Sequence, residues 1–389
     1  MTYTGNCRLG DLFESRRERG RAGLPLLSVT MNDGLVDRDD LERRQDSALT
    51  PEEHLVVKPG DIAYNMMRMW QGAFGLADRD GMVSPAYVVL KPRPDTNSEF
   101  AAHLLRSDRL KYLLWAYSYG ITDDRLRLYY PDFASIPISV PDANQQASIA
   151  RTLSCLDSLI CTVEKSIEVH QQEKRALMRR HFAPTHSLQW RQHGWRRLQL
   201  GEISKIDRDS LSTATPKDFR FRYISLSDVS DGRIVDALEE YAFSAAPSRA
   251  RRRVKPGDVL MATVRPNLKS YAMVDEAHRD SVASTGFAVI TCTNEVLPKY
   301  VYQYLFSDDI QRQINALVAG SNYPAIGSSD VAELLLNVPN AETQDKLTGF
   351  FCAHDRKGFV LGRYAETLRQ ERRALTQRLL GQQHPGKDS

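Results

Sequence analysis

The pentapeptide VKPGD occurs twice in this 389-residue chain, at residues 57–61 and again at residues 254–258. Each copy runs directly into an apolar stretch, IAYNMM after the first and VLMATV after the second. The central proline and glycine favour a tight turn, because proline fixes φ near −65° and glycine tolerates a positive φ. The pentapeptide therefore predicts a turn that begins a strand, and it predicts this turn in two places.

Other short motifs recur in the same order and at nearly the same offset. The matched pairs are LGDL at 9–12 with LGEI at 200–203, LSV at 27–29 with ISL at 224–226, DG at 33–34 with DG at 231–232, SPAYVV at 84–89 with STGFAV at 284–289, and VP at 140–141 with VP at 338–339. One pentapeptide can recur by chance, but a colinear series at one spacing indicates an internal duplication. The chain is predicted to be a tandem pair of one module.

Each module begins with a β-rich part and continues into shorter helical patterns. Apolar and β-branched runs at 24–29, 86–92 and 286–292 alternate with turn signals such as Asn-Asp-Gly and Pro-Gly-Asp. Helical patterns follow at 100–118 and 299–318. The predicted fold class is α+β.

A long helix is predicted after each module, and it carries an apolar seam of period 3.5. Asp142 and Asn340 are expected N-caps. Each helix has about forty residues, roughly 60 Å at 1.5 Å per residue, and cannot bury its seam alone. We expect the two helices to form an antiparallel coiled coil with pseudo-two-fold symmetry that separates the modules; the alternative is that each helix packs on its own module. The seam residues are Ile149, Leu153, Leu156, Ile160, Val163 and Ile167 in the first helix and Leu347, Phe351, Leu361, Leu368 and Leu375 in the second.

The predicted boundaries follow from these patterns. They are a first module at 1–141, a long helix at 142–183, a linker at 184–196, a second module at 197–339, a second long helix at 340–381 and a tail at 382–389. Polar residues interrupt the seam at His170, Lys174, His354, Gly358 and Arg372. The alternatives are that they weaken the pair locally, fix its register or face another protein.

Composition excludes few classes of protein. A formal charge of +3, with 42% hydrophobic and 26% charged residues, is ordinary for a folded chain. The five cysteines include no CxxC pair, and no apolar stretch is long enough to span a membrane, so we expect reduced thiols and a cytoplasmic protein. Neither GxGxxG nor GxxxxGK[ST] occurs, no catalytic residues are predicted, and the loose histidine group His181, His186 and His193 does not favour a metal site.

The remaining candidates for function are basic and polar clusters on predicted loops. Arginine and asparagine can read guanine and adenine edges, while lysine and arginine contact phosphates. A solvated loop without a ligand is the plain alternative for any arginine run. The DNA-binding candidates are Arg68, Arg125, Arg127, Arg249, Arg251, Arg252, Arg265, Asn267, Lys269, Ser321 and Asn322.

Taken together, the pattern resembles the specificity subunits of type I restriction-modification enzymes over almost the whole chain. The similarity rests on the LGDL and LGEI openings, the two VKPGD turns, the stretches YGITDDR (119–125) and AGSNYPAIGSSDV (319–331), the VP boundaries, and the long helix at 145–182. The second helix begins with AETQDKL (341–347), where the family more often shows Gln followed by Ile-Ala.

The resemblance implies a DNA-binding subunit that performs no chemistry itself. Each module would be a target-recognition domain for one half of a bipartite, asymmetric site in double-stranded DNA. The helices would space the halves and dock two methyltransferase subunits that methylate adenine with S-adenosylmethionine. Restriction subunits that translocate DNA with ATP and Mg would join them, and this chain would bind no cofactor. The alternative is a coiled-coil scaffold that binds only proteins.

Overall fold

The computed structural model describes residues 3–31, 33–41, 49–122, 125–182, 194–318 and 324–381. It divides into two compact units: unit 1 comprises Met1–Lys165 with Arg363–Ser389, and unit 2 comprises Ser166–Gly362. Both long helices, α5 (Ala143–Phe182) and α11 (Ala341–Leu380), run through both units. Most of the predicted linker and the whole predicted tail lie outside the described residues.

Unit 1 is built from short strands and four short helices. The strands are β1 (Tyr3–Arg8), β2 (Phe13–Arg16), β3 (Leu27–Val29), β4 (Leu35–Asp37), β5 (Leu55–Val57), β6 (Ile62–Asn65), β7 (Phe74–Leu76), β8 (Gly81–Val83), β9 (Tyr87–Pro92) and β10 (Pro137–Pro141). The helices are α1 (Leu9–Leu12), α2 (Ser98–Leu105), α3 (Asp108–Ala116) and α4 (Tyr130–Ser135), with 3₁₀ turns η1 (Arg38–Asp40), η2 (Pro51–Glu53) and η3 (Met69–Gln71).

Unit 2 repeats these elements and adds more strands. The strands are β11 (Arg196–Gln199), β12 (Ser204–Ile206), β13 (Arg220–Ile224), β14 (Val229–Ser230), β15 (Arg233–Ile234), β16 (Glu240–Ala242), β17 (Ala250–Arg253), β18 (Val259–Ala262), β19 (Tyr271–Met273), β20 (Val282–Ser284), β21 (Phe287–Cys292) and β22 (Leu335–Val338). The helices are α7 (Leu200–Ile203), α8 (Pro298–Leu305), α9 (Asp308–Val318) and α10 (Ser328–Glu333), with η4 (Leu226–Asp228), η5 (Pro266–Leu268) and η6 (Glu276–His278).

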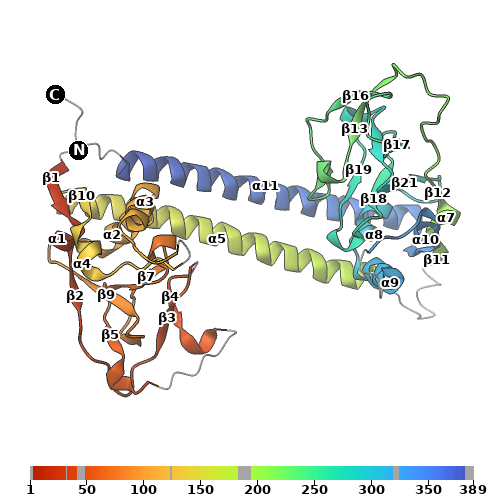
Figure 1. Cartoon of the computed structure of the whole chain (residues 1–389). Helices are drawn as coiled ribbons and strands as arrows, with labels where there is room; N and C mark the ends of the chain where they lie inside the picture. The colour runs from red at the N-terminus through yellow and green to blue at the C-terminus, as the bar shows by residue number, and fades with distance from the viewer. Residues whose placement is uncertain are drawn as a thin grey trace. The chain divides into compact units, whose positions relative to one another are not determined.

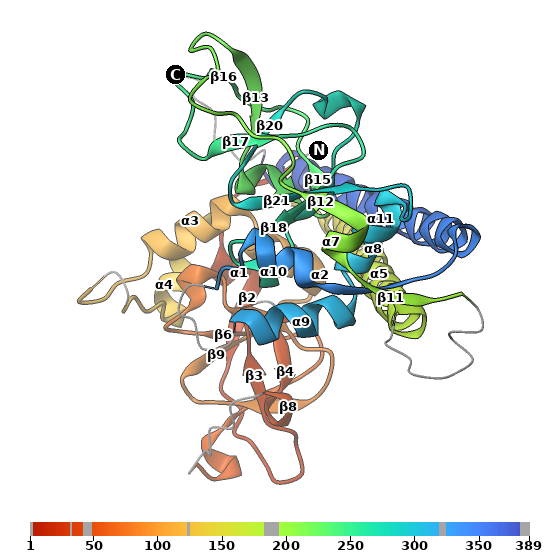
Figure 2. The same cartoon turned by 90° about the vertical axis from the view of Figure 1, so that its right-hand side faces the viewer.

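The duplication predicted from the sequence is confirmed by the sheet topology. The main sheet of unit 1 has the order β2-β9-β6-β7, and the main sheet of unit 2 has the corresponding order β12-β21-β18-β19 (Figure 1). The pairs β1-β10 and β11-β22 also correspond. Unit 2 has a further four-stranded sheet, β16-β13-β20-β17, whose strands lie together in Figure 2. The α+β fold class is confirmed.

Both VKPGD segments form the predicted turn. In Lys58–Asp61 and in Lys255–Asp258 the aspartate amide donates to the lysine carbonyl, at 2.9 and 3.0 Å. The glycines, Gly60 and Gly257, share a φ of +89°, the left-handed region that side chains disfavour. The aspartate carboxylate accepts from the lysine amide in both copies, at 2.9 and 2.8 Å. Each turn leads directly into a buried strand, β6 or β18.

The buried aspartate of the turn has a different partner in each unit. Asp61 is 1% exposed and accepts two bonds from the Arg16 guanidinium, at 2.6 and 3.1 Å. That hydrogen bonding raises the pKa of Arg16. Asp258 accepts instead from the Thr291 hydroxyl at 2.7 Å. Because a buried carboxylate needs a compensating donor, each unit supplies one, charged in unit 1 and neutral in unit 2.

The two long helices pack against each other within each unit, and the pairing is antiparallel (Figure 1). In unit 1, Arg372 binds the Asp157 carboxylate at 2.6 and 3.2 Å, and Arg369 binds Glu164 at 2.6 Å. In unit 2 the early residues of α11 face the late residues of α5, because Phe351 contacts Phe182 at a centroid distance of 5.2 Å.

None of the predicted seam positions is fully exposed. Ile149, Leu153, Val163, Leu347, Phe351 and Leu368 are buried, and Leu156, Ile160, Ile167, Leu361 and Leu375 are half-buried. The helix ends also join the cores of the units. Ile149 and Leu153 belong to the core of unit 1, and Phe182, Leu347 and Phe351 belong to the core of unit 2. Helix pairing and packing on a module, posed as alternatives from the sequence, therefore occur together.

The predicted caps begin both helices. The carboxylate of Asp142 accepts from the Gln145 amide at 2.9 Å, and the side chain of Asn340 accepts from the Thr343 amide at 2.9 Å. None of the described helices is long and apolar enough to cross a membrane, and the five cysteines are free of disulfides.

A buried glutamine in the first turn ties each long helix to its unit. Gln146 donates to the Pro141 carbonyl at 2.9 Å and accepts from the Asn97 amide at 3.0 Å. Gln344 makes the equivalent bonds to the Pro339 carbonyl at 2.9 Å and from the Leu297 amide at 2.8 Å. The side chain thus fixes the helix start against both the preceding strand and the start of α2 or α8.

We expect Gln146→Leu and Gln344→Leu each to lower the free energy of unfolding by about 1–3 kcal/mol, because each leaves a buried amide and a carbonyl without partners. Urea unfolding followed by circular dichroism measures this loss. Asn144→Ala, which changes an exposed residue of the same helical turn, is the control and is expected to be near neutral. Equal stability of the glutamine variants and the control would contradict the assigned role.

Candidate DNA-binding surfaces

The candidate Arg68 and the candidates Arg265, Asn267 and Lys269 occupy equivalent places in the two units. Arg68 lies between β6 and η3, and the other three lie between β18 and β19, around η5. In both units the flanking strands pair antiparallel, β6 with β7 and β18 with β19. The sheet therefore presents one basic connection in each unit.

The connection in unit 2 is held in a strained backbone conformation. Arg265 and Lys269 have φ of +50° and +53°, which costs roughly 1–2 kcal/mol for a residue with a side chain. At the equivalent positions of unit 1, Arg68 has an ordinary φ of −131° and a glycine, Gly72, takes the φ of +90°. Bonds around the turn maintain the unit 2 conformation: the Arg265 amide donates to Pro324 at 2.8 Å. Strain of this kind is common where a loop presents side chains to a ligand.

The side chains of this connection point to solvent. Arg68, Arg265 and Asn267 are exposed, and Lys269 is half-buried. Leu268, between the two polar candidates of η5, is 65% exposed. No side-chain hydrogen bond or ion pair joins Arg68, Arg265 or Asn267 to any other described residue, so their polar groups are available.

In each unit a second loop is hydrogen-bonded to the basic connection, and the bond is equivalent in the two units. In unit 1 the Leu128 amide donates to the Met66 carbonyl at 2.9 Å, and in unit 2 the Ile326 amide donates to the Thr263 carbonyl at 3.0 Å. These bonds bring the segment before α4 or α10 next to the basic connection. The structure therefore groups candidates that are separated by about sixty residues in the sequence.

In unit 1 that second loop carries two exposed arginines among aromatic rings. Arg125 and Arg127 are exposed. Arg127 pairs with Tyr119 through two backbone bonds, at 2.9 and 3.1 Å, and the Tyr119 ring lies 5.7 Å from the Tyr129 ring. Partial desolvation and then the Asp132 carboxylate raise the pKa of Tyr119. The counterparts in unit 2, Ser321 and Asn322, lie outside the described residues.

The arginine run of unit 2 lies elsewhere, on β17 of the second sheet. Arg252 binds the buried Asp207 carboxylate at 3.0 Å. Arg251 stacks over the Phe243 ring at 4.9 Å and donates to the Ala250 carbonyl at 2.8 Å. Arg249 is exposed, and its carbonyl accepts from the Thr285 amide at 2.8 Å. Two of the three candidate arginines thus have partners inside unit 2, which the sequence did not predict; DNA contact by any of them stays a prediction.

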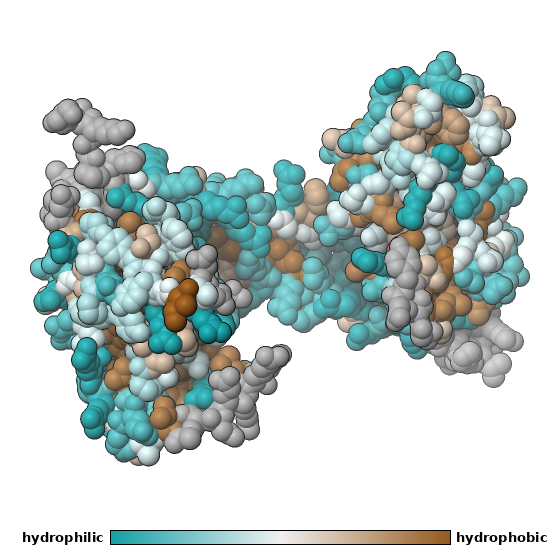
Figure 3. Space-filling model, in the orientation of Figure 1, coloured by the Kyte–Doolittle hydropathy of each residue, from teal (hydrophilic) through white to brown (hydrophobic). Residues whose placement is uncertain are grey.

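Exposed apolar side chains near the unit 1 connection were missed by the sequence analysis. Helix α3 packs against η3 and exposes Tyr112 and Trp115, whose rings lie 5.8 Å apart, and Ile121 is 99% exposed. In the view of Figure 3, hydrophilic residues cover most of unit 1 and single hydrophobic groups stand among them. The spacing of Tyr112 and Trp115 was the available signal, because residues three apart share one face of a helix.

His181 is one of the three histidines considered for a metal site. It lies in the last turn of α5, and the edge of its ring contacts the Phe351 ring, with 6.5 Å between the centroids. Burial, and then Arg180, lowers the pKa of His181. His186 and His193 lie outside the described residues, so the structure brings together no site from this group.

The chain resembles known proteins both in sequence and in fold. No family model matches the sequence. The chain is 29% identical over 185 residues to the HindI specificity subunit of a type I restriction enzyme from Haemophilus influenzae, covering 46% of this chain and 39% of that protein. It is 22% identical over 234 residues to the MjaVIII specificity subunit from Methanocaldococcus jannaschii, covering 54% of this chain and 53% of that protein. The chain therefore matches only about half the length, or less, of these relatives.

Solved structures match over nearly the whole chain. The S subunit of a type I restriction-modification system from M. genitalium superposes with a TM-score of 0.60 at 18% identity, covering 97% of this chain and 96% of that one. The chain has the specificity-subunit fold. A chain from a structural study of complex assembly in a type I system matches with a TM-score of 0.54 at 16% identity, covering 98% and 99% of the two chains. The resemblance stated from the sequence motifs is confirmed.

We expect Arg252→Ala to lower the free energy of unfolding by about 1–3 kcal/mol, because it leaves the Asp207 carboxylate, 7% exposed, without its charged partner. Arg249→Ala is the matched control: it removes an exposed arginine of the same run and is expected to change stability by less than about 0.5 kcal/mol. Thermal unfolding of both variants measures the difference. Similar losses for the two would show that Arg252 has no special role in the fold.

Proposed function

We propose that this chain is the DNA-recognition subunit of a type I restriction-modification enzyme. In this proposal each unit reads one half of a bipartite, asymmetric site in double-stranded DNA. One observation carries it: a scaffold present twice exposes different side chains at the same connection, Arg68 in unit 1 and Arg265 with Asn267 in unit 2. A duplicated scaffold with unlike reading residues is what an asymmetric two-part site requires.

The chemistry of the exposed groups supports DNA as the ligand. A guanidinium can donate two bonds to the major-groove edge of guanine, and an asparagine side chain can pair with adenine. The neighbouring Arg125 and Arg127 of unit 1 suit phosphates, which position the protein without reading sequence. The net charge of only +3 makes these local groups, rather than the whole surface, the source of attraction.

The long helices are proposed to set the distance between the half-sites and to dock two methyltransferase subunits. Exposed apolar side chains on both helices, including Val169, Phe350 and Val360, suit contacts with protein. We infer that this chain carries out no chemistry itself. S-adenosylmethionine is then bound by the methyltransferase subunits, and ATP and Mg by restriction subunits that join the complex. The curated relatives are specificity subunits of such enzymes, which supports these partners.

The alternative function is a protein-binding coiled-coil scaffold that does not read DNA. It shares the helix pair with the main proposal and differs in the role of the loops. The experiment below separates the two, because a scaffold would retain no particular sequence.

The test is selection of random-sequence duplexes by the chain bound to its methyltransferase subunits, followed by sequencing of the retained pool. We expect a bipartite consensus with an unread gap. Arg265→Ala is expected to weaken preference in one half only, by roughly 10- to 100-fold at the base it contacts, and Arg68→Ala in the other half only.

Arg220→Ala is the control, since Arg220 is exposed but already binds Glu240 at 2.7 Å on the second sheet. It is expected to leave the consensus unchanged. A pool without enrichment at any salt concentration would refute DNA recognition, and loss of both halves in one arginine variant would refute the division of reading between the units.

A further inference from the structure

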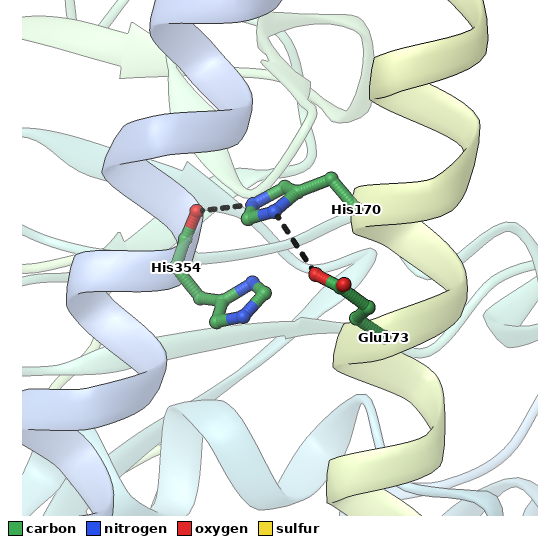
Figure 4. Close-up of side chains that lie close together, drawn as sticks. All are labelled: His170, Glu173 and His354. Atoms are coloured by element: carbon green, nitrogen blue, oxygen red, sulfur yellow. Dashed lines mark hydrogen bonds and ion pairs between the residues drawn. The ribbon is translucent and has the colours of Figure 1, made fainter.

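A polar cluster interrupts the apolar seam of the helix pair inside unit 2. His170 and Glu173 lie on α5 and His354 lies opposite on α11 (Figure 4). The His170 side chain is only 7% exposed. Its ring lies flat on the His354 ring, with centroids 4.1 Å apart and planes within 10° of parallel. Two imidazoles and a carboxylate from facing helices thus meet at one level of the seam.

The hydrogen bonds of His170 determine which ring nitrogen is free. Nε2 of His170 lies 2.9 Å from the backbone carbonyl of His354 (Figure 4). A carbonyl can only accept, so Nε2 carries the proton and, in the neutral ring, Nδ1 carries the lone pair. This Nδ1 is buried without a hydrogen-bond partner in the part of the chain that the structure describes, and a Glu173 carboxylate oxygen lies 4.0 Å from it. Metal-binding histidines are commonly oriented by such a bond from the other nitrogen to a carbonyl.

His354 supplies the second imidazole of the cluster. Nδ1 of His354 is also buried without a hydrogen-bond partner among the described residues. Burial, and then the neighbouring His170, lowers the pKa of His354. Two buried ring nitrogens without hydrogen-bond partners are unfavourable in an apolar seam, where a leucine would pack at no such cost.

We propose that His170, Glu173 and His354 bind one divalent transition-metal ion, best zinc, that joins α5 to α11. The ligands would be Nδ1 of each histidine and one carboxylate oxygen of Glu173, with water in the fourth position. Zinc accepts this mixture of nitrogen and oxygen ligands. The sequence analysis expected no metal site, because the three residues are brought together from two distant segments.

Binding of one ion by both rings requires the stacked pair to open, because an imidazole lone pair lies in its ring plane and the two planes are within 10° of parallel. One ring nitrogen of each histidine and one Glu173 oxygen lie within 4.8 Å of one another, whereas bonds of about 2.0–2.2 Å place tetrahedral ligands roughly 3.3 Å apart. Glu173 has a side chain 58% exposed and His354 is half-buried, so both can turn toward a fixed His170. Gly358 makes room for that ring, because a Cβ there would lie 3.4 Å from Cδ2 of His170.

The charged side chains around the cluster permit a cation to bind, but they favour only weak binding. Lys174 is bound to the Asp355 carboxylate, which also accepts from Gln303 at 2.6 Å. Lys174 and Lys357 are the cationic side chains that act on His354, and Glu173 opposes them. Because Asp355 neutralises Lys174, the one anionic ligand, Glu173, is opposed mainly by Lys357, and we expect micromolar rather than nanomolar affinity.

Calorimetric titration of the chelator-treated full chain with Zn²⁺ tests the proposal. We expect one ion per chain with a micromolar dissociation constant, at least 10-fold weaker binding in Glu173→Gln and in His354→Gln, and a thermal midpoint that zinc raises by a few degrees in the unmodified chain but not in these two variants. Glu168→Gln, which changes an exposed glutamate of the same helix, is the control and is expected to bind normally.

Cobalt supplies a second readout that does not depend on stability. Co²⁺ bound at this site is expected to give the visible absorption of a tetrahedral nitrogen and oxygen site, and that absorption should be lost in His354→Gln. Binding weaker than millimolar, or equal binding by the unmodified chain and both ligand variants, would overturn the proposal and would assign any bound zinc to other residues.

Discussion

Burial of the apolar seams of two forty-residue helices is the constraint on which the rest of this structure depends. A helix of this length exposes an apolar stripe that neither neighbouring module can cover alone. The chain solves the problem twice over: the helix ends enter the cores of the units, as Leu153 and Phe351 show, and the remaining seam is covered by the other helix. Ion pairs such as Arg372 with Asp157 and the histidine contact at His170 fix which residues face one another.

Comparison of the two units shows which structural features recur and which differ. The main sheet order, the Lys-Pro-Gly-Asp turn and the glutamine clamp at Gln146 and Gln344 recur with nearly equal distances. Of these features, the glutamine bonds attach each unit to its long helix. The connection after β6 or β18 does not attach the unit to its long helix. At this connection Arg68 and Arg265 differ in backbone conformation and in neighbours. The side chains at this connection can therefore vary without loss of the scaffold.

The sequence predicted the features that depend on local or periodic patterns. The tandem repeat, the turns at Gly60 and Gly257, the caps Asp142 and Asn340 and the helix pair were all readable, because each is set by residue spacing. Contacts between residues that lie far apart in the sequence could not be predicted from it. The bond from Arg252 to Asp207 was not predicted, because nothing near either residue in the sequence signals the other, and DNA contact by Arg252 stays a prediction. The contact of His170 with His354 was hidden for the same reason, although both were noted as polar interruptions of the seam.

We propose that the helix pair sets the spacing between two independent reading units. The most direct test inserts one heptad into each helix, after Lys165 in α5 and after Gly362 in α11, which keeps both seams in register, and repeats the selection of DNA sites. About 10 Å of added helix corresponds to at most three base-pair steps. The account predicts the same two half-sites with a gap longer by one to three base pairs. An unchanged gap, or altered half-sites, would contradict it.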